Sequence, residues 1–84
     1  MRLPIIKHIV QFIEDNDPDY IEETITVLEH LSDSPNIKDE EIDVIGELLS
    51  NLYGSIEVNK EIESGEKSKD ALNNFMKRVQ GSIN

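Results

Sequence analysis

Three aspartates at alternate positions, Asp15, Asp17 and Asp19, are the first residues of this sequence whose spacing could support chemistry. Alternating carboxylates open the calcium-binding loop of EF-hand proteins. The sixth position of that loop would be Tyr20, where the sharp turn needs glycine, and the twelfth would be Thr26, where a bidentate glutamate is needed. Because the motif stops after its opening, we predict no metal site at these residues.

The histidines and serines do not form a catalytic or metal-binding pattern. A di-iron site in a helical bundle needs Glu-x-x-His on two helices, and His8 and His30 both lack that spacing. No serine has a neighbouring histidine base or a glycine-framed turn. Asp33-Ser34 is similar to the modified serine of acyl carrier proteins, but Pro35 follows where those proteins have an aliphatic residue. We therefore expect no enzyme activity, no catalytic residue and no cofactor.

The overall composition is strongly acidic. The chain has 84 residues, with 18 Asp and Glu against eight Lys and Arg, and a formal net charge of −10. This charge argues against binding to DNA, RNA or anionic membranes, because such binding depends on Lys and Arg. The absence of cysteine fits a reducing compartment, and the apolar run at the N-terminus is too short for a signal peptide or a membrane span. We predict a cytoplasmic chain with no targeting segment.

Apolar side chains recur at intervals of three and four residues through four segments of the chain. Pro4 suits the first turn of the first segment, and Asp17-Pro18 is a strong start signal for the second. These patterns predict helices at about 4–14, 18–31, 39–63 and 69–80. No segment shows the alternation of a strand. The sequence therefore predicts an all-α fold, a small single-domain bundle of four helices with a long third helix, in which short connections make consecutive helices antiparallel.

The expected helix 39–63 carries apolar residues on two sides. One stripe is expected to face the core and contains Ile42, Ile45, Leu49, Leu52, Tyr53 and Ile56. A second set lies around the helix from the first and contains Val44, Leu48, Val58 and Ile62. One small chain has difficulty covering both sides of so long a helix. Either a partner covers the second set, or the helix 69–80 covers Val58 and Ile62 and leaves Val44 exposed.

The same helix has a ridge of small residues, in which Gly46, Ser50 and Gly54 recur every four residues. A glycine inside a helix costs about 1 kcal/mol relative to alanine, so a compensating contact is expected. Close approach of another backbone would provide it. That backbone belongs either to another helix of the same chain or to a second copy in a homodimer.

The acidic residues are unevenly distributed. Between His8 and Lys38 there are eight carboxylates and no Lys or Arg. The helix 18–31 and its flanking loops therefore form an acidic surface. This surface either keeps the protein soluble or attracts a basic partner, for which charge contributes association rate and selectivity more than affinity.

The stretch Asp43-Val44-Ile45-Gly46-Glu47-Leu48-Leu49-Ser50-Asn51, together with Ala71-Leu72-Asn73 and Gly81-Ser82-Ile83, resembles a family of short bacterial all-helical proteins of unknown function. The resemblance spans about the whole chain. It implies no catalytic or binding residue.

Together these patterns predict a non-enzymatic module that works by protein–protein contact, as a homodimer built on the third helix or as an acidic subunit of a complex with a basic protein. The alternative is a helical bundle that binds a small molecule or a metal. The residues expected at the interface are Val44, Gly46, Leu48, Ser50, Gly54, Val58 and Ile62.

Overall fold

A computed structural model describes residues 1–81, and within this range the chain forms four α-helices and no strand. The all-α prediction is confirmed. The helices are α1 (Leu3–Asp15), α2 (Asp19–Ser32), α3 (Asp39–Glu63) and α4 (Ser68–Gly81). Each boundary lies within one residue of the predicted one, and α3 is the longest helix, as expected.

Local hydrogen bonds fix the starts of α2 and α3. The side-chain Oδ1 of Asp17 accepts the backbone N–H of Asp19 at 2.9 Å, which satisfies one of the free donors at the start of α2. At the start of α3, the backbone N–H of Lys38 donates to Oε1 of Glu41 at 3.0 Å. Both carboxylates also place negative charge where the helix dipole is positive.

Gly65 ends α3 with a Schellman turn. Its φ of +110° lies in the region that L side chains rarely adopt. The N–H of Gly65 donates to the carbonyl of Ile62 at 3.0 Å, and the N–H of Glu66 donates to the carbonyl of Glu61 at 3.2 Å. The chain therefore leaves α3 in a fixed direction, which sets the path of α4.

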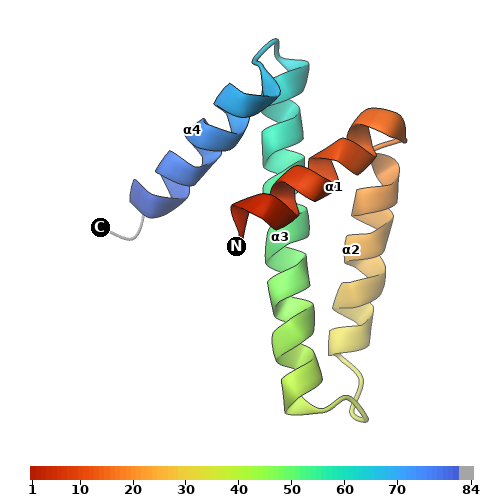
Figure 1. The fold of residues 1–84 in the computed structure, drawn as a ribbon. Helices are drawn as coiled ribbons and strands as arrows, with labels where there is room; N and C mark the ends of the chain where they lie inside the picture. Colours follow the sequence, from red (N-terminus) through yellow and green to blue (C-terminus); the bar gives the residue numbers. More distant parts are fainter. Residues whose placement is uncertain (82–84) are drawn as a thin grey trace.

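The three shorter helices all pack on α3. Figure 1 shows α2 and α3 side by side in opposite directions, α1 crossing in front of α3, and α4 leaving the end of α3 at an angle. The antiparallel prediction is thus correct for α2 and α3, whereas α1 crosses instead. The molecule is flat, with extents of 43 × 34 × 17 Å.

The crossing of α1 follows from the two core clusters that it joins. Ile6 and Val10 of α1 pack with Val58 of α3 and with Ala71, Leu72 and Phe75 of α4. Ile13, one turn further along α1, packs instead with Ile21 and Ile25 of α2 and Leu52 of α3. A helix that supplies side chains to both clusters must pass over α3 between them. Full burial of each Ile, Val, Leu or Phe side chain in these clusters stabilises the fold by roughly 1.5–3 kcal/mol.

Candidate interaction surface

The ridge of small residues on α3 divides into a covered half and an open half. Gly54 is buried, and a Cβ at this position would lie 3.0 Å from both Ile6 Cδ1 and Phe75 Cζ. A Cβ at Gly46 would have no atom within 4 Å. Ser50, between them, donates its hydroxyl to the carbonyl of Gly46 at 3.0 Å. The compensating contact at Gly54 therefore comes from side chains of α1 and α4 of this chain and not from a closely approaching backbone, and the ridge does not continue as one open surface.

The second apolar set of α3 divides in the same way. Val58 is fully buried between α1 and α4, and Ile62 packs against the same cluster. Assigning Val58 and Gly54 to an external interface was therefore wrong, because helices of the same chain already cover them. The alternative, in which the last helix covers Val58 and Ile62, describes the structure. Val44 and Leu48 remain exposed.

Val44 and Leu48 lie on the side of α3 that faces α1. They continue the spacing of Asn51 and Ser55, at intervals of four, three and four residues. Asn51 is buried, and its Oδ1 accepts the backbone N–H of Arg2 at 2.9 Å, so this side of α3 contacts the start of α1. Val44 and Leu48 extend the same side beyond the point that α1 covers.

On α2, a matching row faces the same way. Tyr20, Thr24, Val27 and Leu31 follow one another at intervals of four, three and four residues. The Tyr20 ring contacts the Phe12 ring of α1 edge to face, with 5.9 Å between the centroids. This contact places the row on the side of α2 that faces α1.

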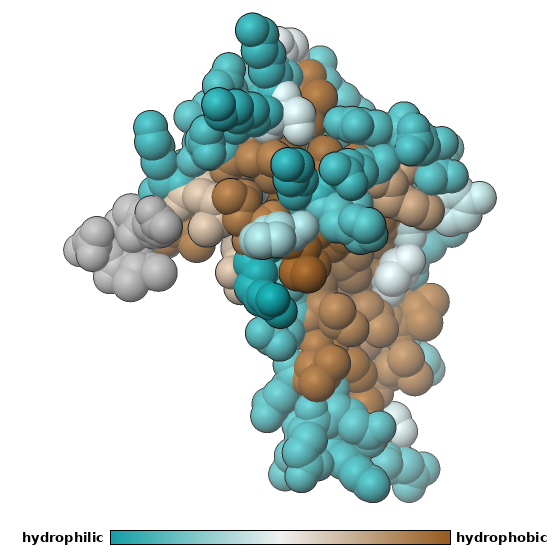
Figure 2. Space-filling model, in the orientation of Figure 1, coloured by the Kyte–Doolittle hydropathy of each residue, from teal (hydrophilic) through white to brown (hydrophobic). Residues whose placement is uncertain are grey.

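The two rows and Phe12 form one apolar surface, which we call the exposed apolar face. Its six large side chains are 43–59% exposed and are Phe12, Tyr20, Val27, Leu31, Val44 and Leu48. Figure 2, seen from the side of α1, shows hydrophobic residues gathered over α2 and α3 below α1. A hollow of about 340 Å³ opens under the edge of α1, lined by His8, Ile9, Phe12, Tyr20, Ile21, Thr24 and Leu52.

Carboxylates border the exposed apolar face. Glu23 lines the surface beside Tyr20, Thr24 and Val27 of α2. On α3, Glu40 and Glu47 lie four residues before and three residues after Val44, so they are its neighbours on the helix surface. All three glutamates are exposed. The face therefore combines an apolar floor with acidic edges.

The opposite side of the α2–α3 pair is more polar. Tyr53 donates its hydroxyl to Oε2 of Glu29 at 3.0 Å and joins α3 to α2 there. This hydrogen bond raises the pKa of Tyr53 above 10.0, with smaller contributions from burial and from the Glu29 charge. Tyr53 is 46% exposed and Ile42 is 38% exposed. Assigning these two residues to the core was wrong, because the apolar stripe is wider than the surface that α2 buries, and both side chains stay exposed.

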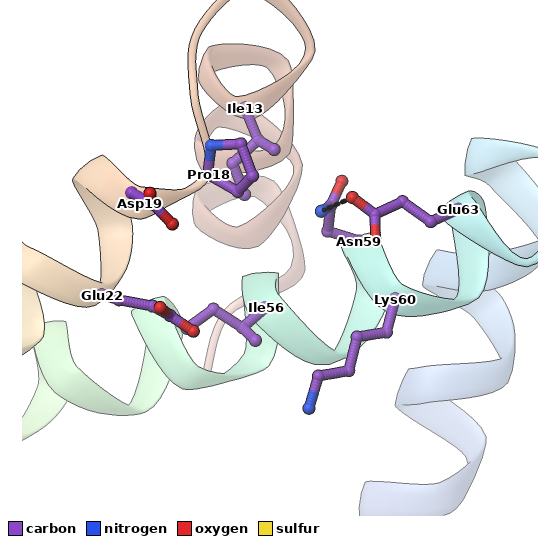
Figure 3. A pocket seen from close by; sticks show the side chains of 8 residues that line it. All are labelled: Ile13, Pro18, Asp19, Glu22, Ile56, Asn59, Lys60 and Glu63. Atoms are coloured by element: carbon purple, nitrogen blue, oxygen red, sulfur yellow. Dashed lines mark hydrogen bonds between the residues drawn. The ribbon is translucent and has the colours of Figure 1, made fainter.

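Figure 3 shows a further small cleft of about 170 Å³ where α1, α2 and α3 meet. Its lining includes Ile13 and Ile56, and three of its polar side chains make local contacts: Asn59 Nδ2 donates to Oε1 of Glu63 at 3.2 Å, and Lys60 pairs with Glu57 at 3.5 Å. Within residues 1–81, no group of three or more His, Asp or Glu side chains is placed to hold a metal ion. None of the helices in this range is long and apolar enough to cross a membrane.

Comparison with known proteins identifies the family. The model of DUF6952, a family of unknown function, matches residues 1–84. The chain belongs to this family. Neither the curated proteins nor the solved structures yield a match. The predicted membership of a family of unknown function is thus confirmed, without bearing on the bacterial origin that the resemblance implied, and Ser82 and Ile83, which also carried the resemblance, lie outside the described residues.

The sequence analysis of this DUF6952 member placed only Val44 and Leu48, two of the six residues of the exposed apolar face, at an interface. The signal for the row on α2 was the width of the apolar surface of that helix. The row from Tyr20 to Leu31 lies on one flank of the buried residues Ile21 and Ile25, and a single neighbouring helix cannot cover both.

Proposed function

We propose that this chain binds another protein through the exposed apolar face and acts without catalysis. The observation that supports this most strongly is the continuity of the face, since six large apolar side chains from three helices lie on one side of the molecule. Isolated exposed apolar residues are normal in proteins, but a contiguous patch marks an interaction site. A reducing cytoplasm is the compartment that the cysteine-free composition suits.

The fold leaves this face uncovered for a structural reason. Figure 1 shows α1 and α4 at the C-terminal half of α3, so the N-terminal half of α3 has only α2 beside it. A pair of helices one layer thick cannot bury apolar residues that point out of the layer. A partner placed on this layer would complete the second layer that the chain itself does not supply.

Site-specific photo-crosslinking in cells of the source organism tests the proposal. A photoreactive residue replaces Val27 or Leu48 on the exposed apolar face. Matched controls carry it at Thr26 and Glu57, which are exposed on the same two helices but lie outside the face. We expect protein adducts from Val27 and Leu48 and few or none from Thr26 and Glu57. Equal yields from all four positions, or no protein adduct from Val27 and Leu48, would contradict the proposal.

A second candidate function is the binding of a small apolar molecule in the hollow under α1. The hollow of about 340 Å³ is within the range of ligand pockets, and His8, Thr24 and Tyr20 add polar groups to its apolar lining. Native mass spectrometry of the protein from its own source separates the two functions. Extra mass of a few hundred daltons on a monomer, lost in Thr24→Trp, would favour the small molecule.

A further inference from the structure

We infer that the exposed apolar face binds an amphipathic helix with basic flanks from a partner protein. The inference rests on the proposed function and specifies the chemistry of the partner. It follows from two features of the face, its shape between α1, α2 and α3 and the sign of the charges along its edges.

The shape suits a helix. The floor consists of two rows of side chains spaced at three and four residues, with Tyr20, Thr24, Val27 and Leu31 on α2 and the shorter pair Val44 and Leu48 on α3. The edge of α1, with Ile9 and Phe12 over the hollow, closes one end. Side chains spaced at three and four residues on an incoming helix would fit between such rows, as in other helix-in-groove complexes.

The charges select a basic helix over a second copy of this chain. Glu23 borders the face on α2, and Glu40 and Glu47 border it on α3. No Lys or Arg occurs between His8 and Lys38, and the six carboxylates between Lys38 and Lys60 also have no basic residue among them. A second copy packed face to face would bring carboxylates against carboxylates. Lysines or arginines flanking an apolar helix would instead meet opposite charges.

Within residues 1–81, no ion pair links a Lys or Arg to Glu23, Glu40 or Glu47. Lys7 and Lys69 line a separate hollow where the starts of α1 and α4 meet. Arg78 pairs with Glu61 beside α4. The exposed apolar face therefore keeps its acidic edges available to a partner.

Binding of designed peptides to the purified full chain tests the inference. The probes are synthetic helices of about 18 residues, because isolated shorter helices are marginally stable. The first has leucines at intervals of three and four with lysines on both flanks. The second has glutamates in place of the lysines, and the third keeps the lysines but replaces the leucines with glutamine. Fluorescence anisotropy should show at least tenfold tighter binding of the first probe than of either other probe, weakening as salt is added.

Two double variants locate the binding. Val27→Gln with Leu48→Gln removes apolar contacts without changing charge and should weaken the first probe at least tenfold. Glu23→Lys with Glu47→Lys should reverse the preference toward the glutamate probe. The matched control, Glu22→Lys with Glu57→Lys, makes the same change in net charge on the same helices outside the face and should retain the original preference. Circular dichroism confirms that each variant is folded.

Several results would overturn the inference. The inference fails if the lysine and glutamate probes bind equally well, or if neither probe binds. It also fails if the Glu22/Glu57 control pair changes the preference between the probes as much as the Glu23/Glu47 pair does. A dimer in sedimentation that Val27→Gln with Leu48→Gln dissociates would show that a second copy covers the face. In that case the basic-helix inference fails while the proposed function stands, because protein contact at the face is retained. The crosslinking experiment decides the proposed function separately.

Discussion

The Phe75 ring of α4 lies 3.0 Å from the position that a Cβ on Gly54 of α3 would occupy. Ile6 Cδ1 of α1 approaches the same position equally closely. Three helices therefore meet at a residue with no side chain, and the absence of a Cβ allows α1 and α4 to close over α3. Gly46, in the same ridge, has no atom within 4 Å of the corresponding position. Of the two glycines, only Gly54 is therefore required for the packing of other helices on α3.

Substitution of these two glycines by alanine should change stability in opposite directions. Gly54→Ala should lower the free energy of unfolding by about 1 kcal/mol, because the overpacking cost of about 1–3 kcal/mol exceeds the gain in helix propensity of about 1 kcal/mol. Gly46→Ala should raise it by about 0.5–1 kcal/mol, since the new methyl group meets open space. Urea denaturation measures both, and stabilisation by Gly54→Ala would show that α1 and α4 do not pack this closely.

The buried side chain of Asn51 ties the start of α1 to the middle of α3. Its Oδ1 accepts the N–H of Arg2 at 2.9 Å, and its Nδ2 donates to the carbonyl of Glu47 at 2.9 Å. Asn51→Ala should lower the free energy of unfolding by about 1–2 kcal/mol and speed amide exchange in the first turn of α1. Asn59→Ala, which removes a surface hydrogen bond to Glu63, should change stability by less than about 0.5 kcal/mol. Equal effects of the two changes would contradict this role for Asn51.

Arg78 joins α4 to α3 through one ion pair, and it also contacts an aromatic ring of its own helix. Its guanidinium pairs with Glu61 and lies 5.9 Å from the centroid of the Phe75 ring. Because the Arg78 side chain is 55% exposed, we expect Arg78→Ala to cost only about 0.5–1 kcal/mol. A double-mutant cycle of Arg78→Ala with Glu61→Gln should return a coupling of about the same size. Zero coupling would mean that the ion pair does not stabilise the docking of α4.

The hydrogen bond from Tyr53 to Glu29 should be visible in a pH titration. In a Tyr20→Phe background, the tyrosinate absorbance of Tyr53 should report a pKa above 10.0, and Glu29→Gln should lower that pKa. The folded-state pKa is raised, so the stabilisation from this bond is fully present below pH 10 and is lost as the pH rises through the folded-state value. An unchanged titration in Glu29→Gln would show that the bond does not form in solution.

The sequence was sufficient for most of the local structure. Asp17 and Pro18 marked the start of α2, because capping depends on residues adjacent in the chain. The spacing of apolar residues gave the four helices and the length of α3. The acidic composition and the lack of cysteine likewise required no knowledge of the fold.

Tertiary structure alone decided which apolar residues are covered. Val44 and Val58 belong to the same predicted set on α3, yet Val58 is fully buried and Val44 is exposed. Periodicity gives the direction of a side chain around its helix, but it does not give the position along the helix at which a neighbour stops. That position depends on where α1 crosses α3 and on how α4 packs against α1 and α3, and both are settled by contacts between residues far apart in the chain.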